Sequence, residues 1–411
     1  MFSLLASIAL LIVGYFTYGR FVEKVFMPDD RKTPAYTEAD GVDFVPLKLW
    51  KSYLIQLLNI AGTGPIFGAL MGAVFGPIVF LWIVFGCILG GAVHDYMTGM
   101  ISERNKGASI AELSGIYLGP VIKWIMRFFS VLLLVLVGAV FVTSPAALLA
   151  ILTPDVLDET FWIAVIVIYY FCATLIPIDK LIGHLYPFFG AVLILMTLGI
   201  LGGSLVEYNF AIPEINFVNM HPEGLPVFPF MFITVACGAI SGFHATQSPM
   251  ISKCIQSEHH GRKVFYGAMI SEGIIALAWA AAGVVFYEGT GGLLAALNEA
   301  GQSATVYNIS VGMLGPVGGI LAIIGVVACP ITSGDTAFRS ARLIIAETFH
   351  VPQKKVDKRC AIAIPLFLAG FALTQLNFDV LWRYFSWSNQ TLAMLALLVF
   401  TAYLLKKHKN K

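Results

Sequence analysis

The sequence predicts an all-α integral membrane protein, and two observations lead to this prediction. Apolar residues make up 58% of the 411 residues and charged residues only 12%, whereas soluble domains average about 45–50% and about 25%. Apolar runs of roughly 20 residues, the length that crosses a bilayer as a helix, also recur along the whole chain with no polar domain between them. We therefore expect a single membrane domain over residues 1–411.

About 11 transmembrane helices are predicted. The first, residues 1–20, lacks the basic start and the small-residue cleavage site of a signal peptide, so we expect it to be an additional N-terminal helix. The others are expected near 53–74, 77–101, 120–147, 161–178, 182–207, 226–252, 264–287, 307–332, 360–378 and 380–405.

The distribution of lysine and arginine supports this order of spans. Short cytoplasmic loops hold an excess of these residues, and with the N-terminus outside only Arg383 of the 25 falls on the wrong side. We therefore expect a multi-pass protein of a bacterial or archaeal plasma membrane (inner membrane), with its N-terminus outside and its C-terminus cytoplasmic.

Two of the predicted spans are interrupted at corresponding places. The first contains Ala61-Gly62-Thr63-Gly64-Pro65, and the second contains Cys237-Gly238-Ala239-Ile240-Ser241-Gly242-Phe243-His244 followed by Ser248-Pro249. Glycine destabilises a helix interior by about 1 kcal/mol and proline by about 3 kcal/mol, and hydrocarbon offers no water to the freed backbone groups. Paired broken helices in matching positions are typical of secondary transporters, whose substrate and ion bind where the helices unwind.

The spans that follow the first one divide into two sets of five. Residues 53–207 form the first five-helix repeat, which starts inside, and residues 226–405 form the second, which starts outside. The repeats are therefore inverted, and a broken helix leads each of them. This arrangement is that of the LeuT-type 5+5 inverted repeat, so we expect one membrane transport domain with this fold.

Five short motifs resemble those of a known family. They are Asn59-Ile60-Ala61-Gly62-Thr63-Gly64-Pro65-Ile66, Gly91-Ala92-Val93-His94-Asp95, Asn105 with Gly107-Ala108-Ser109, Ser241-Gly242-Phe243-His244, and Asn389-Gln390-Thr391-Leu392-Ala393. In their order and spacing from about residue 50 onward they resemble the carbon starvation protein A family. The resemblance implies proton-coupled uptake of short peptides or pyruvate through the bacterial inner membrane, and a relation to the amino acid, polyamine and organocation transporters.

The predicted substrate site consists of residues in the two breaks. Helix ends at the first break attract a substrate carboxylate, and an imidazole in the second break can bond substrate or carry a proton. The alternatives are a proline kink that lets helices pack closely and a histidine that only ties down unwound backbone. The predicted residues are Gly62, Thr63, Gly64, Pro65, Gly238, Ser241, Gly242, His244, Thr246 and Gln247.

A second group of residues is predicted to couple transport to an ion. Hydroxyl and carboxylate oxygens can hold sodium, and a carboxylate in a partly dry place can instead carry a proton. A lysine near the start of the span at 182–207 can replace sodium, which favours protons; the alternative for Asp335 is an ion pair with Arg339 on the same helix face. The residues are Asp335, Thr332, Ser333, Thr336 and Lys180, at the cytoplasmic ends of their spans.

Other ionisable residues suggest neither an enzyme nor a bound metal. No HExxH motif and no serine-histidine-aspartate pattern occurs. His94, Asp95 and His244 are the candidates for a metal, but neighbouring side chains of a helix point in different directions, so anchoring by Arg104 or Lys106 is the preferred interpretation of the first two.

Glu272 is an acid deep in an apolar span, 264–287, and such residues are functional candidates by default. Its alternative is to pair or to reach the membrane surface. Asn389 and Gln390 are expected to bond across helices in preference to binding substrate.

The sequence therefore predicts a secondary active transporter that imports short peptides or pyruvate with protons and serves the response to carbon starvation. The alternatives are a sodium-coupled transporter of another small carboxylate or amino acid, a membrane nutrient sensor, and a channel with a transporter-like fold. We expect no cofactor besides the coupling ion. We also expect no nucleic acid partner, because the basic residues form no patch beyond the ordinary positive-inside loops. The expected partners are a small-molecule substrate and the lipid bilayer.

Overall fold

The computed structural model describes residues 1–411 except 42, 176–177, 207–211, 354 and 410–411, and it leaves aside the side chains of residues 174–185, 326 and 408–409. Within this part the chain is helical, with one isolated bridge and no strand. The helices are α1 (Phe2–Phe16), α2 (Tyr18–Phe26), α3 (Pro34–Thr37), α4 (Leu49–Ile60), η1 (Gly64–Gly68), α5 (Ala69–Ala73), α6 (Val79–Phe85), η2 (Gly86–Gly91), α7 (Ala92–Arg104), α8 (Ile110–Leu118), α9 (Pro120–Leu152), α10 (Glu159–Leu175), α11 (Ile178–Val206), α12 (Val227–Thr234), α13 (His244–Ser252), η3 (Glu258–His260), η4 (Arg262–Tyr266), α14 (Gly267–Phe286), α15 (Thr290–Ala322), η5 (Ile323–Ala328), α16 (Cys329–Thr348), α17 (Val356–Leu373) and α18 (Phe378–Lys409). Four of these, η1, η2, η4 and η5, are π-helical, and η3 is a 3-10 turn.

The predicted all-α membrane class is confirmed. Among the described residues 7 helices are long and apolar enough to cross a membrane, or 8 if the bent pair of α4 with η1 and α5 is one span. The other predicted spans fall on α10, which is shorter, on α17, which begins with three charged residues, and on the broken pair α12 and α13.

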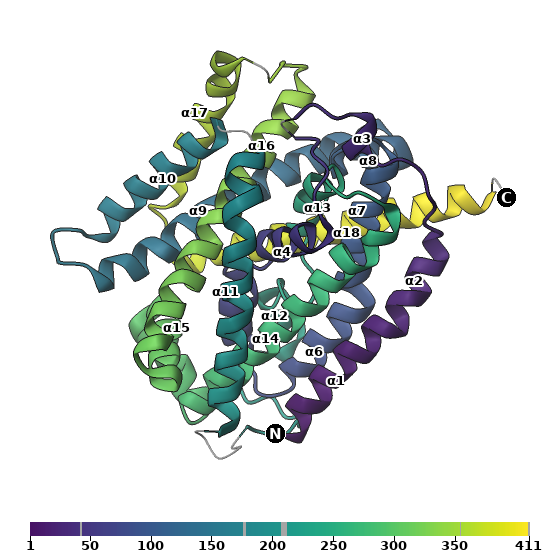
Figure 1. Cartoon of the computed structure of the whole chain (residues 1–411). Helices are drawn as coiled ribbons and strands as arrows, with labels where there is room; N and C mark the ends of the chain where they lie inside the picture. The colour runs from purple at the N-terminus through teal and green to yellow at the C-terminus, as the bar shows by residue number, and fades with distance from the viewer. Residues whose placement is uncertain (42, 176–177, 207–211, 354, 410–411) are drawn as a thin grey trace.

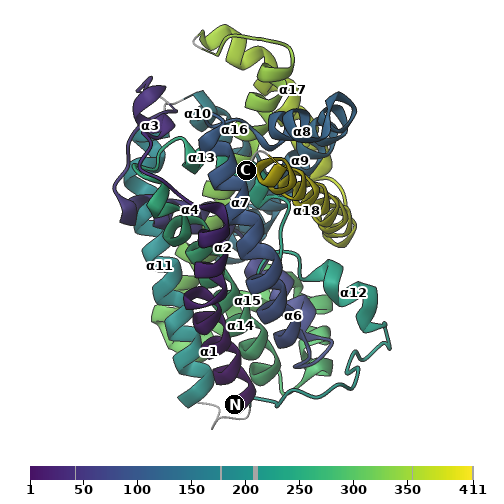
Figure 2. The ribbon, with the colours of Figure 1, turned by 90° about the vertical axis from the view of Figure 1, so that its right-hand side faces the viewer.

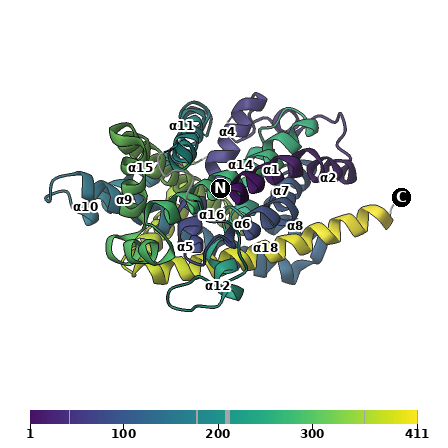
Figure 3. The ribbon, with the colours of Figure 1, turned by 90° about the horizontal axis from the view of Figure 1, so that it is seen from below.

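The helices are arranged around a buried centre. Figure 1 shows α11 running beside α14, with α1 and α2 along one edge and α10 projecting at the opposite edge. Figure 2, turned by 90°, shows α11, α1, α14 and α6 in the same half of the molecule, with α17 and α8 at the far end from the N-terminus. Seen from below in Figure 3, α10 and the C-terminal end of α18 mark the two extremes. The segment α13 and the C-terminal half of α4 are buried among these helices.

Both predicted breaks are present. The first broken helix ends at Ile60 as α4 and resumes at Gly64 as η1, with a bend of 56° between the two parts. In the second, α12 ends at Thr234 and α13 begins at His244, so residues 235–243 between them are not helical.

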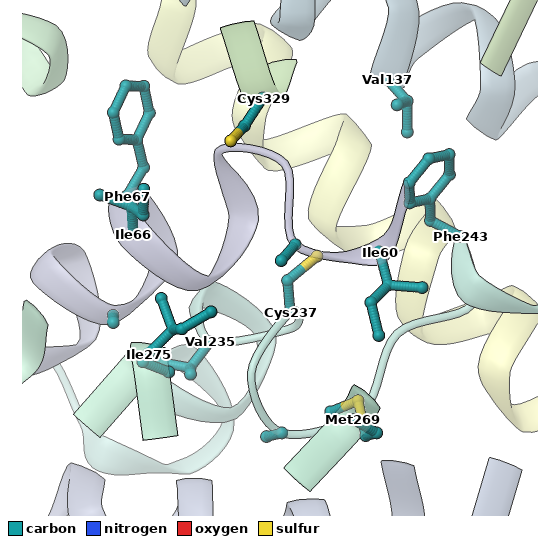
Figure 4. Close-up of a cluster of buried hydrophobic side chains, with 14 of the residues drawn as sticks. Ile60, Ile66, Phe67, Val137, Val235, Cys237, Phe243, Met269, Ile275 and Cys329 are labelled. Carbon is teal, nitrogen blue, oxygen red and sulfur yellow. The ribbon is translucent and has the colours of Figure 1, made fainter. Parts of the chain in front are cut away.

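The two breaks pack directly against each other, and this contact explains two of their glycines. A Cβ added to Gly64 would lie 2.3 Å from the Cβ of Cys237, so no larger residue fits. Gly238 has a φ of +91°, which glycine adopts without the steric cost that other residues meet. Figure 4 shows Cys237 beside the coil that joins Ile60 to Ile66.

Two predicted boundaries differ from the structure. The connection after the span at 77–101 contains α8, a short helix whose polar Glu112 and Ser114 hide it from a search for apolar spans. The span predicted at 307–332 begins inside α15, which bends at Gly301 and Gly315, and the helical course continues through η5 and α16 to Thr348. Positive φ values at these two glycines allow the bends.

Candidate functional site

The centre of the site is a buried chain of ionisable residues from α7 and α13. His244 occupies the first position of α13, directly after the second break, and Asp95 lies in the first turn of α7. Asp95 Oδ2 lies 2.9 Å from His244 Nδ1, and Asp95 Oδ1 lies 3.0 Å from His94 Nδ1. All three side chains have 0% exposure. The aspartate therefore holds two imidazoles, although sequence reasoning expected the two neighbours in α7 to be anchored elsewhere.

The cations expected to anchor them have other partners. Arg104 donates to Glu258 at 2.7 Å from Nε and 2.8 Å from Nη2, and Lys106 lies 3.2 Å from Glu38. The anchoring interpretation of His94 and Asp95 is therefore wrong, because α7 turns both side chains into the protein instead of toward the loop.

Glu272 extends this chain from α14. Its Oε1 accepts the Gly238 N–H at 3.1 Å, and its Oε2 lies 3.4 Å from His244 Nε2. The glutamate is completely buried, so of its two alternatives the pairing is present, with His244, and the membrane surface is not reached. One carboxylate thus holds the unwound backbone with one oxygen and faces the histidine with the other.

A set of metal-binding atoms lies on the same side of the histidine. One donor atom from each of Cys237, His244 and Glu272 lies within 4.8 Å of the other two. The set differs from the candidates that the sequence suggested, because both oxygens of Asp95 already face imidazole Nδ1 atoms. The sequence does not reveal this set because Cys237 and His244 belong to the second broken helix, whereas Glu272 belongs to α14.

Several predicted substrate residues have a structural role in the second break. Ser241 Oγ donates to Asn389 Oδ1 at 3.2 Å, and the same oxygen accepts the Phe243 N–H at 2.7 Å. A Cβ on Gly242 would lie 2.2 Å from the Asn389 carbonyl oxygen. As expected, Asn389 bonds across helices, and so does Gln390, which donates to the Phe232 carbonyl at 3.1 Å.

Other polar atoms of the two broken helices are buried without a partner. The atoms Asn59 Oδ1, Asn59 Nδ2, Thr63 Oγ1 and Gln247 Oε1 have no hydrogen bond to any described residue. A buried polar group without a partner costs about 1–3 kcal/mol, so such a concentration marks a place where another molecule can supply the bonds. Asn59 was not among the predicted site residues. Its position two residues before the first break is the feature of the sequence that could have indicated a role there.

The two broken helices are also joined by direct polar contacts. Gln56 Nε2 of α4 donates to Ser248 Oγ of α13 at 3.0 Å. Gln247 Nε2 donates to Thr246 Oγ1 at 2.9 Å, and that hydroxyl donates to the Phe243 carbonyl at 2.6 Å. The predicted residues Gly62, Thr63, Gly64 and Pro65 of the first break are buried as well.

A cavity of about 450 Å³ reaches this region. Thr246, Pro249 and Met250 of α13 form one side of it, and Ser340 and Glu347 of α16 contribute to the other. Thr246 is two residues from His244 along α13, so the cavity borders the helix that carries the histidine.

Four of the five predicted ion-coupling residues lie together in α16, but inside the helix and not at its end. Thr332 Oγ1 donates to the Cys329 carbonyl at 2.8 Å, Ser333 Oγ donates to the Leu58 carbonyl at 2.9 Å, and Thr336 Oγ1 donates to the Ser333 carbonyl at 2.9 Å. The three hydroxyls therefore hold the backbone of α16 and, through Leu58, the end of α4.

Asp335 is completely buried in the same segment. Tyr186 OH donates to its Oδ2 at 3.2 Å, Arg339 Nη2 lies 3.9 Å from that oxygen, and Oδ1 has no hydrogen bond to a described residue. The pairing with Arg339 that the i,i+4 spacing suggested is present. The side chain of Lys180, the remaining predicted residue, lies outside the described residues.

Comparisons with known proteins agree with this architecture. The model of the family "Carbon starvation protein CstA" matches residues 1–154 and 146–306. An uncharacterized membrane protein of Haemophilus influenzae is 44% identical over 333 residues, which cover 68% of this chain and 90% of that protein. The peptide transporter CstA of Bacillus subtilis is 26% identical and covers 98% of this chain and 85% of its own length.

Two further comparisons bear on function and fold. The pyruvate/proton symporter BtsT of Escherichia coli is 28% identical over 75% of this chain, and this chain spans about half, 52%, of that protein. The solved structure of MhsT in complex with L-phenylalanine aligns with a TM-score of 0.63 at 16% identity, over 84% of this chain and 88% of its own. A likeness at this identity concerns the fold alone.

Proposed function

This chain belongs to the carbon starvation protein CstA family, and on that premise we propose that it is a secondary active transporter that imports short peptides or pyruvate with protons. The observation that carries the proposal is the direct packing of the two broken helices, with partnerless polar atoms of Asn59, Thr63 and Gln247 buried around their junction. In secondary transporters the substrate binds at such a junction. Relatives named as a peptide transporter and a pyruvate/proton symporter supply the substrate classes.

Neutral hydrogen-bonding groups suit either substrate. An amide such as Asn59 offers both donors and acceptors, so it can bond a carboxylate, a keto group or a peptide unit. The helix ends at the first break favour a carboxylate electrostatically. We propose that the substrate lies between Asn59, Thr63 and Gln247, with His244 at its edge.

Proton coupling is favoured over sodium coupling by the contacts in α16. Arg339 Nη2 lies 3.9 Å from Asp335 Oδ2, so a positive charge already lies beside the carboxylate that a sodium ion would need. We propose Asp335 as the carboxylate that takes up the proton, since its Oδ1 has no hydrogen bond to a described residue. No enzymatic activity forms part of this proposal.

The proposed location is the bacterial inner membrane, with the N-terminus outside and the C-terminus in the cytoplasm. The placement of lysine and arginine in the loops supports this orientation. The family description supports the proposed role in carbon starvation.

Counterflow tests whether the protein is a carrier. Liposomes that contain the purified protein are preloaded with unlabelled pyruvate or unlabelled alanine dipeptide, and the labelled compound is added outside without any ion gradient. A carrier exchanges one for the other and transiently concentrates the label inside. A channel gives no such overshoot, and a sensor binds without exchange, so either of these results for both compounds would contradict the proposal.

A further inference from the structure

We propose that Cys237, His244 and Glu272 bind a divalent metal ion of the zinc class in the second break. A thiolate, an imidazole and a carboxylate are the ligand types that zinc takes in proteins. One donor atom of each lies within 4.8 Å of the other two, and all three side chains are buried. Metal binding at this place does not depend on whether the protein transports a substrate.

The distances fit a tetrahedral ion. Two ligand atoms that each lie about 2.0–2.2 Å from zinc are roughly 3.3–3.5 Å apart in a tetrahedral site. His244 Nε2 and Glu272 Oε2 are 3.4 Å apart. Cys237 Sγ is the third ligand atom, and a thiolate lies farther from zinc, at about 2.3 Å. The sulfur of Cys237 lies within 4.8 Å of the other two donor atoms, so the His244–Glu272 pair already has the tetrahedral spacing and the cysteine completes the set by moving toward it.

Two of the three atoms that face the proposed ion have no hydrogen bond to a described residue, whereas the third, Cys237 Sγ, lies 3.4 Å from Ser241 Oγ. The two atoms without a hydrogen bond are His244 Nε2 and Glu272 Oε2. If His244 Nδ1 carries the ring proton, Nε2 presents a lone pair to a carboxylate oxygen, which is unfavourable unless a cation lies between them. With the proton on Nδ1, the buried pair therefore needs a positive charge between its two lone pairs, and a metal ion supplies one.

The surroundings hold the ligands as a metal site requires. Asp95 Oδ2 lies 2.9 Å from His244 Nδ1, the carboxylate–histidine arrangement that fixes the ring and its tautomer in metal sites. The second oxygen of the glutamate, Oε1, accepts the Gly238 N–H at 3.1 Å, which orients the carboxylate. Both contacts are of the kind that supports metal ligands from outside the coordination shell.

A metal at this place would link two parts of the fold. Cys237 and His244 belong to the second break, whereas Glu272 belongs to α14, so the ion would fasten the unwound segment to that helix. Three protein ligands also leave a fourth position open, as in zinc sites that bind a further molecule.

Cobalt titration tests the proposal. Full-length purified protein in detergent is stripped with a chelator and titrated with Co²⁺, whose bond to a thiolate gives a charge-transfer absorption in the near ultraviolet. We expect one equivalent to produce this band and added Zn²⁺ to abolish it. Cys237→Ser should remove the band, whereas Cys329→Ser, at another buried cysteine, should leave it unchanged.

Two more variants distinguish binding from folding. Glu272→Gln keeps an acceptor for the Gly238 N–H but removes the charge, and should weaken Co²⁺ binding at least tenfold with unchanged thermal unfolding of the metal-free protein. Asp95→Asn, which acts through the histidine, should weaken binding about 10–100-fold. Absence of the band in the wild type, or a band that persists after Cys237→Ser, would overturn the proposal. Absence of the band would leave a proton shared by His244 and Glu272 as the occupant of the gap.

Discussion

His244 stands where the two broken helices, α7 and α14 meet. The contacts of its ring with Asp95 and Glu272 explain why a charged or polar side chain is tolerated with no exposure to solvent. The sequence indicated that His94, Asp95, His244 and Glu272 were unusual, because ionisable residues in apolar spans are rare. It did not indicate that they touch, since 149 residues separate Asp95 from His244 along the chain.

Replacing His244 with alanine should abolish uptake while the protein remains folded. The change removes the ring that faces Asp95 and Glu272, and it leaves two buried carboxylates without the group between them. We expect uptake of labelled substrate to fall at least about tenfold, equivalent to 1.4 kcal/mol. His221→Ala, outside the buried junction, serves as the control. Uptake kinetics equal to those of the wild type would remove His244 from the site.

Replacing Asp335 with asparagine should weaken coupling more than binding. Asparagine keeps an oxygen for the Tyr186 hydroxyl but cannot take up a proton, so counterflow should persist while proton-driven accumulation is lost. The exposed Asp357→Asn is the matched control. If Asp335→Asn accumulates substrate under a proton gradient as the wild type does, the aspartate does not couple transport.

At the scale of elements, the breaks are the part of the fold that the sequence predicts best. Gly62, Gly64 and Pro65 marked the first break, and the structure places the bend between Ile60 and Gly64. Local chemistry decides where a helix can continue, so single residues were sufficient evidence. Contacts between elements are not written in local chemistry, and the packing of Gly64 against Cys237 became visible only in three dimensions.

Gly64→Ala should destabilise the protein by forcing the breaks apart. The new Cβ would lie 2.3 Å from the Cβ and 2.4 Å from the Sγ of Cys237, and overpacking of this kind costs about 1–3 kcal/mol. We expect a lower unfolding temperature and reduced transport, both partly restored in the double variant Gly64→Ala with Cys237→Gly. Gly202→Ala is the control, because an added Cβ there meets nothing within 4 Å.

An unfolding temperature of the Gly64 variant equal to that of the Gly202 variant would contradict the close packing of the breaks. Failure of the double variant to recover any stability would show that the strain arises elsewhere.

Asn389→Ala should loosen the second break. Its Oδ1 accepts the Phe243 N–H and the Ser241 hydroxyl, and a buried N–H left without a partner costs about 1–3 kcal/mol. Hydrogen exchange at residues 241–244 should therefore become faster than in the wild type. Thr391→Ala, which removes an exposed hydroxyl bonded within its own helix, should leave the rate of this hydrogen exchange unchanged. Unchanged exchange in the asparagine variant would show that the break is held by other contacts.

At the scale of the whole molecule, hydropathy, charge placement and the pairing of the breaks predicted the helical transporter fold, and the likeness to MhsT agrees with it. Helix boundaries were less predictable where polar residues lie inside helices, as in α8 and α16. The sequence placed Asp335 at a helix end, whereas it lies well inside α16, because the surrounding helices bury the polar residues of that segment. The proposed substrate site includes atoms such as Asn59 Oδ1, which has no hydrogen bond to any described residue, and no sequence pattern reveals this.

The most direct test of the transporter proposal is uphill uptake by the purified protein in liposomes. Labelled pyruvate and labelled alanine dipeptide are each offered under an inward proton gradient, an inward sodium gradient of equal size, and no gradient. We predict accumulation above the external concentration of at least one compound under the proton gradient, and only equilibration under the other two conditions. Accumulation driven by sodium alone would contradict the proposed coupling, and no accumulation of either compound under any gradient would contradict the proposed function.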